Sequence, residues 1–398
     1  IRAVTIPFYA TSSEQQIQYI INDSKIRFLF VGEQEQYEKA HRVLALCPTL
    51  QRIIVFDKNV KLKPLDPNTL YFDDFFKLGE GLPRQSEVEQ RCKEATFDDI
   101  ANILYTSGTT GESKGVILTV GQYHAALEAN QKCVNVNEDD RVLNFLPFAH
   151  IFEKAWAVLS LAGGARLLVN NDPKRVQQSM RETNPTCMSA VPRFWEKVYA
   201  GVNEKIEKAG SLQKRIFKNA LAVGRKYNIE YLSHGKRPPL PLRLKYDVIN
   251  KILFAKVRKE LGLIHPNIFP TAGAAISNHV EEFVHSIGIN MISGYGLTES
   301  LATVSCNHLD KPYSVGSVGY VIDGLDVKIS EDGEVLLKGP TIFKGYYNRE
   351  DITAASFTPD GYFKTGDAGY MKKGELFLTE RIKDLFKTSN GKYIAPQM

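Results

Sequence analysis

Apolar residues in the first half of the chain alternate between short continuous runs and longer stretches at helical spacing. The runs KIRFLFVG and RIIVFD predict strands. A helix is predicted over SEQQIQYIIND, where Ser12 and Gln15 suit a capping box, and another over QYEKAHRVLALC. After a polar stretch at residues 78–95, the runs IANILYTSG, DRVLNFLPFAH and ARLLVN predict further strands. Strands that alternate with helices predict a parallel α/β sheet covered on both faces.

Two later regions depart from this alternation. Residues 193–260 are helix-rich and basic, with Leu212, Ile216 and Val223 at helical spacing. From about Ser314 onward, short apolar runs are separated by Asp-Gly and Lys-Gly turns, which predict antiparallel hairpins. We therefore expect an α/β fold with a large N-terminal region of two α/β subdomains, followed by a small antiparallel β-barrel.

The same changes of pattern give the predicted domain boundaries. Because the first residue is Ile1 rather than Met, we expect an interior fragment that is truncated at both ends. The expected parts are an α/β subdomain with a phosphate loop at 1–125, a second α/β subdomain at 126–313 with a basic helical insertion at 196–260, a β-barrel at 314–381, and a hinge with the start of a C-terminal domain at 382–398.

Composition narrows the class of protein. Hydrophobic residues make up 43% and charged residues 24%, which excludes disordered, coiled-coil and collagen-like chains. No apolar run approaches the ~18 residues of a membrane span. The five cysteines are scattered without Cys-x-x-Cys spacing, which argues against a disulfide framework or a zinc cage and favours a reducing compartment. We expect a cytoplasmic location.

Charge is concentrated in one region. The net charge is +5, but the stretch from Glu196 to Glu260 holds sixteen Lys or Arg and six Asp or Glu, a net charge of +10. Such a block favours an anionic partner. Three interpretations stay open: peripheral association with an anionic membrane, steering of the phosphates of coenzyme A, or ordinary solvated helix faces. No nucleic-acid partner is predicted.

The segment YTSGTTGESKG, from Tyr105 to Gly115, carries the strongest chemical signal. An apolar strand runs into three glycines, several hydroxyl side chains and Lys114. Glycines let backbone N–H groups close on an anion, and the hydroxyls and the lysine add donors and charge. The P-loop motif GxxxxGK[ST] does not fit, because Ser113 stands where that motif has its second glycine. The segment therefore predicts a phosphate-binding loop of another kind.

This segment resembles the signature of the acyl-adenylate-forming enzymes. Further matches follow in the family's order: LPFAHIFE, TAGAAI, GYGLTES, GEVLLKGPTIFKGYYN, GYFKTGD and ERIKDLFKTSNGKYIAP. The resemblance covers nearly the whole chain, and FPTAGAA, SNGKYIAPQ and the basic insertion are similar to the long-chain fatty acyl-CoA synthetase branch. In that family a small C-terminal domain follows, and we expect it to be missing from this fragment.

The resemblance implies a two-step reaction that uses ATP, Mg²⁺ and coenzyme A. A fatty acid attacks ATP to give acyl-AMP and pyrophosphate, and the thiol of coenzyme A then displaces AMP. One alternative is a fatty acyl-AMP ligase or another adenylate-forming ligase with a different acid or acceptor. A second alternative, from another class, is a catalytically silent nucleotide-binding or membrane-associated protein. Pyrophosphate release measured over a panel of acids and acceptors separates these hypotheses.

The resemblance also assigns residues to the nucleotide. In the phosphate loop these are Thr106, Ser107, Gly108, Thr109, Thr110, Gly111 and Lys114. In GYGLTES, Tyr295 and Gly296 would contact adenine, Thr298 a phosphate, and Glu299 the Mg²⁺ ion. In TAGAAI, Gly273 and Ala274 would let the backbone approach the purine and the carboxylate, although Ala272 stands where the family usually has glycine.

The remaining assignments lie outside these loops. Asp367 resembles the ribose-binding aspartate, Arg381 the arginine beside the ribose and phosphates, and Asp384 the hinge of the C-terminal domain. His150 resembles a residue near the acyl carboxylate, with a structural role as the alternative. Trp195 is a candidate gate of a fatty-acyl tunnel or else a core residue.

Overall fold

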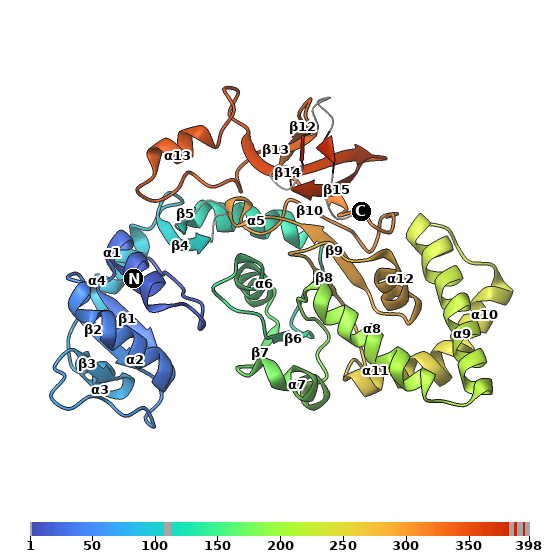
Figure 1. The fold of residues 1–398 in the computed structure, drawn as a ribbon, viewed down its shortest axis with the longest axis horizontal. Helices are drawn as coiled ribbons and strands as arrows, with labels where there is room; N and C mark the ends of the chain where they lie inside the picture. Colours follow the sequence, from blue (N-terminus) through green and yellow to red (C-terminus); the bar gives the residue numbers. More distant parts are fainter. Residues whose placement is uncertain (1, 107–112, 382–385, 388–392, 395–398) are drawn as a thin grey trace. The chain divides into compact units, whose positions relative to one another are not determined.

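A computed structural model describes residues 2–106, 113–381, 386–387 and 393–394, with the backbone alone given from residue 380 onward (Figure 1). The chain divides into two compact units, and each is described by itself. Unit 1 comprises Ile1–Val120 and Lys344–Ala354, and unit 2 comprises Gly121–Phe343 and Ala355–Met398.

Unit 1 contains a parallel sheet in the order β1-β2-β3. Ile53 and Val55 in the middle strand are fully buried, and α1 and α2 supply Ile21 and Tyr37 to the same core. The α/β alternation predicted for this region is confirmed. The elements are α1 (Glu14–Ser24), β1 (Phe28–Val31), α2 (Gln34–Val43), β2 (Arg52–Val55), β3 (Thr69–Tyr71), α3 (Phe72–Lys77) and α4 (Gln85–Lys93).

The capping box of α1 lies one residue later than predicted. Ser13 accepts a hydrogen bond from the backbone N–H of Gln16, whose side chain accepts one from the N–H of Ser13. Ser12 is buried instead. Both pairs satisfy the sequence pattern, so the pattern alone does not distinguish them.

Unit 1 also holds an antiparallel hairpin of β4 (Ile100–Thr106) and β5 (Lys114–Thr119). Thr106 pairs in register with Lys114, so the predicted phosphate loop connects the two strands. The Tyr105 hydroxyl donates to Asp23 of unit 1 at 2.5 Å. A further helix, α13 (Glu350–Ala355), begins in the returning segment of this unit.

Unit 2 is organised by a sheet in the order β12-β13-β14-β15-β11-β10-β9-β8. The β8–β9 pair is parallel, and the other neighbours are antiparallel. The strands are β8 (Phe269–Thr271), β9 (Met291–Tyr295), β10 (Ser305–Cys306), β11 (Tyr320–Val321), β12 (Asp326–Ile329), β13 (Glu334–Lys338), β14 (Phe363–Lys372) and β15 (Glu375–Arg381). Closure of the later strands into a barrel, and the predicted boundary at Ser314, stay predictions.

A second parallel pair, β6 (Arg141–Asn144) with β7 (Arg166–Val169), continues the α/β part of unit 2. Cys187 makes parallel bridges to Val142 and to Ile268, and therefore links β6 to the β8 segment. A short pair, β16 (Phe386–Lys387) with β17 (Tyr393–Ile394), lies near the end of the chain.

Helices of unit 2 cover this framework. In Figure 1, α12 lies beside β9, and α8 and α9 pack on α12. Their core contains Trp195, Phe254 and Phe269, each fully buried. The helices are α5 (Val120–Gln131), α6 (Ile151–Ala162), α7 (Val176–Thr183), α8 (Pro192–Glu207), α9 (Ser211–Arg225), α10 (Leu240–Ile249), α11 (Ala255–Leu261) and α12 (Asn278–Ser286).

The apolar side predicted for residues 212–223 is divided between core and solvent. Phe217 and Val223 of α9 are buried, but Leu212 and Ile216 are 68% and 53% exposed. Helical periodicity therefore identifies the helix without showing how much of its apolar side the neighbouring helices cover.

Candidate nucleotide and acyl site

The GYGLTES motif forms a tight loop at the carboxyl end of β9. A Cβ added to Gly296 would lie 1.2 Å from the carbonyl oxygen of Ala302, so the loop closes only with glycine at this position. The carbonyl oxygen of Leu297 accepts from the N–H of Ala302 at 3.0 Å. Ala302 has φ +75°, a left-handed conformation that disfavours a side chain and is enriched at functional sites.

Tyr295 and Asp367 meet although they are far apart in the sequence. The Tyr295 hydroxyl donates to the Asp367 carboxylate at 2.6 Å, and each residue is 8% exposed. Asp367 lies on β14 and pairs in register with Arg381 on β15, and both strands belong to the same sheet as β9. Three residues assigned from separate motifs therefore belong to one sheet, with the side chain of Arg381 outside the described part.

Thr298 and Glu299 lie in the 3₁₀ turn Thr298–Ser300 and are half-buried. The carbonyl oxygen of Glu299 accepts from the N–H of Phe343 at 2.7 Å. Because this contact and the Gly296 closure fix the backbone on both sides, the Glu299 side chain starts from a defined position.

The TAGAAI segment lies beside this loop. Gly273 has φ +93°, a conformation that favours glycine, and it is exposed together with Ala274. Ala272 and Tyr295 both line a cavity between α5, α6 and the strands β8 to β10. The volume of the cavity is about 70 Å³. Most of its lining is apolar, including Leu127, Trp156, Leu159, Ile292 and Leu301.

Trp195 lies behind this cavity. Its indole N–H donates to the Thr271 hydroxyl at 2.8 Å, and Thr271 lines the cavity. The ring is fully buried and packs edge-on against Phe269. In this conformation Trp195 supports the cavity wall through Thr271, and its role as a gate stays a prediction.

His150 and Glu153 organise the LPFAHIFE segment. His150 caps α6, with its Nδ1 accepting from the N–H of Phe152 at 3.2 Å. Glu153 is fully buried and accepts from the Asn144 side chain and the Phe145 N–H, both at 3.0 Å, and from the Ser189 hydroxyl. Burial raises the pKa of this carboxyl group. Sequence reasoning missed Glu153, although a lone acidic residue in the apolar run IFEKAWAVLSLA was an available signal.

The phosphate-loop residues belong to unit 1. Thr106 ends β4 and Lys114 begins β5, and both are half-buried. The Lys114 ammonium lies 5.4 Å from the centre of the Tyr346 ring, within cation–π distance. The other assigned residues, namely Ser107, Gly108, Thr109, Thr110, Gly111 and Asp384, lie outside the described residues.

Solved structures define the class of this fold. An anthranilate CoA ligase bound to anthranoyl-AMP is similar with a TM-score of 0.72 and 17% identity, over 99% of this chain and 66% of that one. The N-terminal domain of FACL13 from Mycobacterium tuberculosis is similar with a TM-score of 0.67 and 21% identity, over 95% of this chain and 80% of that one. The chain therefore shares its α/β fold with these two proteins.

The AMP-binding enzyme family matches residues 1–347, and the chain belongs to that family. Long chain acyl-CoA synthetase 4 of Arabidopsis thaliana is 29% identical over 98% of this chain, and long-chain-fatty-acid–CoA ligase ACSBG2 of Xenopus laevis is 30% identical over 98%. FadD15 of Mycobacterium bovis, a long-chain-fatty-acid–CoA ligase, is 30% identical over 99%. The chain spans 60%, 54% and 64% of these three relatives, respectively. The resemblance read from the motifs is confirmed.

Proposed function

We propose that this chain is the nucleotide- and acyl-binding part of a long-chain fatty acid–CoA ligase. The observation that carries the proposal is the junction at Tyr295, which both hydrogen-bonds Asp367 and lines the apolar cavity. A nucleoside at the polar end and an apolar acyl chain in the cavity would place a carboxylate beside Ala272, where the two regions meet. The cavity lies next to the exposed, side-chain-poor segment that follows β8.

The residues of the site fit the electrostatic demands of the first step, in which two anions react. A carboxylate attacks a phosphate, so catalysis depends on neutralising negative charge and aligning the reactants. In unit 2, Asp367 would accept hydrogen bonds from ribose hydroxyls and the Tyr295 ring would pack on adenine, and in unit 1 Lys114 with the phosphate loop would hold the β- and γ-phosphates. The carboxylate of Glu299 on its fixed turn fits Mg²⁺, which prefers one or two carboxylates together with substrate phosphates. When bound, Mg²⁺ would neutralise phosphate charge.

The identity of the acid rests on two supports. The apolar lining favours an apolar tail, and the three relatives above are named for long-chain acids. The alternative is an adenylate-forming ligase with a different acid or acceptor, because the anthranilate CoA ligase shares this fold with an aromatic acid. Pyrophosphate release with fatty acids of increasing length, with anthranilate, and with coenzyme A present or absent tests both readings. Release that requires an aromatic acid would contradict the long-chain assignment.

A matched pair of variants tests the nucleotide site. Tyr362 donates to Asp326 in an exposed pair with the same chemistry as Tyr295 with Asp367. Asp367→Asn should lower pyrophosphate release at limiting ATP by about 10- to 100-fold, the range for loss of a charged hydrogen-bond partner. Asp326→Asn should leave it unchanged. Equal activity of the two variants would contradict a nucleotide role for Asp367.

We also propose peripheral association with an anionic membrane at its cytoplasmic face. Leu240, Leu244, Val248 and Ile252 occupy every fourth position from the start of α10 and are 58 to 71% exposed. The neighbouring α9 exposes Leu212 and Ile216 beside basic residues. Exposed apolar stripes flanked by Lys and Arg suit the interface of an anionic leaflet. Among the described helices none is long and apolar enough to cross a membrane.

Vesicle co-sedimentation tests this association. Arg215→Glu/Lys218→Glu reverses two exposed charges on α9 and should lower binding to anionic vesicles at least about tenfold at low salt. Lys372→Glu/Lys373→Glu makes the same charge change at an exposed hairpin and should bind like the wild type. If both double variants bind equally, or if the wild type does not bind, the membrane proposal fails. If the Arg215→Glu/Lys218→Glu variant binds vesicles normally but reacts more slowly with coenzyme A, the basic residues act on that substrate instead.

A further inference from the structure

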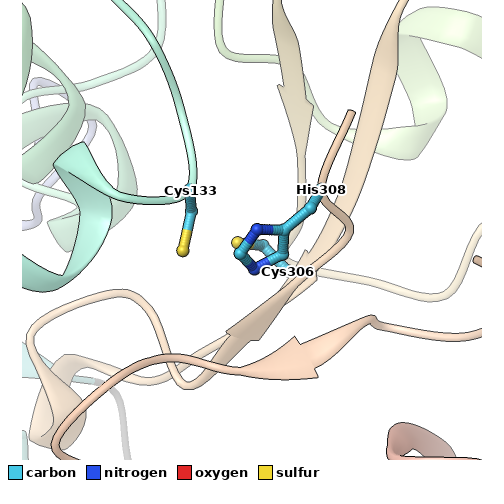
Figure 2. Close-up of side chains that lie close together, drawn as sticks. All are labelled: Cys133, Cys306 and His308. Atoms are coloured by element: carbon cyan, nitrogen blue, oxygen red, sulfur yellow. The ribbon is translucent and has the colours of Figure 1, made fainter. Parts of the chain in front are cut away.

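Two cysteines and one histidine converge in unit 2 at the edge of the apolar cavity, whose lining includes Cys306. Figure 2 shows Cys133 pointing toward Cys306 and His308. Each residue offers one ligand atom, and these three atoms all lie within 4.8 Å of one another. Cys133 and Cys306 are free thiols, and among the residues that the structure describes, Asp310 is the ion-pair partner of His308, with its carboxylate 3.8 Å from Nδ1.

Backbone geometry explains how the three side chains come together. Cys133 follows the end of α5, and its thiol donates to the carbonyl oxygen of Ala129 at 3.4 Å. Cys306 ends β10, and His308 stands two residues later along the chain. Residues two apart in extended chain project to the same side. The edge of the His308 ring also packs against Tyr320, which restrains its orientation.

The cluster is mostly removed from water. Cys306 and His308 are each 6% exposed, and Cys133 is half-buried, so access is from the Cys133 side. A thiolate is the form that binds metal ions.

We propose that Cys133, Cys306 and His308 bind a Zn²⁺ ion through two thiolates and one imidazole nitrogen. Tetrahedral zinc places two thiolate sulfurs about 3.8 Å apart at Zn–S distances of about 2.3 Å, so the cluster needs only a small contraction. Two thiolates balance the charge of the ion, and binding releases two thiol protons to solvent. Water that reaches the cluster from the half-buried Cys133 side would supply the fourth ligand. The scattered spacing that argued against a zinc cage is the reason this site is invisible in the sequence.

The site is distinct from the proposed Mg²⁺ position in its chemistry. Soft thiolate ligands select Zn²⁺ or Cu⁺, whereas Mg²⁺ takes oxygen ligands. A bound ion would tie the end of α5 to β10 and the segment after it. Because metal bound only by the folded chain stabilises that chain, Zn²⁺ should raise the melting temperature.

Metal titration of the reduced, chelator-treated protein tests the proposal. The wild type should bind one equivalent of Co²⁺ with a near-ultraviolet thiolate-to-cobalt band, and Zn²⁺ should displace it. Cys133→Ser removes the half-exposed ligand and should weaken Zn²⁺ binding by more than the roughly 10- to 100-fold typical of losing an outer-shell partner. His308→Asn should do the same. Cys92→Ser, which removes an exposed thiol of unit 1, should bind like the wild type.

Further readouts keep the proposal falsifiable if a variant folds poorly. In the wild type, Zn²⁺ should protect two thiols from a thiol reagent and raise the melting temperature, and it should raise that of Cys92→Ser equally. Failure of the wild type to bind Zn²⁺ or Co²⁺, or equal binding by a folded Cys133→Ser protein, would overturn the proposal. A Cys133–Cys306 disulfide found by peptide mapping of protein kept under mild reductant would also overturn it, in favour of redox chemistry.

Discussion

Charged side chains of unit 2 are exposed on the basic helices and buried beside the sheet. On the helices, charges lie in solvent and pair loosely: Lys205 contacts Glu260 at 2.9 Å and Lys208 contacts Glu204 at 2.6 Å, with all four side chains largely exposed. Exposed pairs of this kind contribute about 0–1 kcal/mol each. Two carboxylates packed against the sheet are buried and hydrogen-bonded instead.

Glu375 on β15 and Glu281 on α12, which packs against β9, illustrate the second arrangement. Glu375 accepts from the N–H and hydroxyl of Ser314 at 2.8 and 2.7 Å, and from the Ser317 hydroxyl at 2.7 Å. Glu281 accepts from the Gly316 N–H at 3.0 Å and the Ser293 hydroxyl at 3.2 Å. Burying a charge is costly unless hydrogen bonds compensate for the lost water. Substitutions near the sheet should therefore have large effects, and those on the helices small ones.

The largest expected effect is at Glu299. Glu299→Ala should lower adenylation by about 10²–10³-fold, because it removes one electrostatic contact of the transition state. The melting temperature should change little, since the side chain is only half-buried. Glu331→Ala, at an exposed turn, is the matched control. Near-normal pyrophosphate release by Glu299→Ala would show that the Mg²⁺ assignment is wrong.

A pair of glycines sharpens the comparison in stability. Gly296→Ala would drive a methyl group into the backbone at Ala302, and we expect a loss of about 3 kcal/mol in the free energy of unfolding. Gly201 lies within α8 with no atom near an added Cβ, so Gly201→Ala should stabilise by roughly 0.5–1 kcal/mol. Urea denaturation measures both. Equal stability of the two variants would mean that the GYGLTES loop relaxes freely.

The third prediction concerns a buried pair on α12. Burial raises the pKa of Glu281 from 4.5 to about 7, so its contribution to stability falls as pH rises through that window. Burial lowers the pKa of His285 from 6.5 to about 4, so its contribution rises with pH between those values. One proton stays on the pair in both the folded and the unfolded chain between about pH 4.5 and 6.5. The two slopes therefore cancel in the wild type.

Single variants should reveal each slope. In Glu281→Gln, stability should rise from pH 4.5 to 6.5, on the order of 2 kcal/mol, and in His285→Gln it should fall. In the double variant, these two positions should add no change of stability with pH. Any slope that remains comes from the other groups that face them, namely Glu282, Glu375 and Tyr313. Urea denaturation across this pH range is the measurement. Parallel pH profiles for the two single variants would contradict the pKa directions.

Contiguous motifs carried most of what the sequence predicted. Alternating strands and helices indicate the α/β fold because a parallel sheet must be covered on both faces. The site loop at GYGLTES could be predicted from the sequence, because the residues that form the loop are within seven positions of one another. Glu153 was missed because its partners Asn144 and Ser189 come from separate segments, and the cluster of Cys133, Cys306 and His308 likewise exists only after folding.

The smallest expected effect is on the helices. Lys205→Ala breaks the contact with Glu260, whose pKa is lowered mainly by the hydrogen bond from Lys205. The stability from this lowered pKa is present above the ordinary value of 4.5 and is lost as pH falls below it. Because both side chains are exposed, the change in the free energy of unfolding at pH 7 should be below about 1 kcal/mol and should shrink further with added salt. A loss as large as that of Gly296→Ala would erase the distinction between the helices and the sheet.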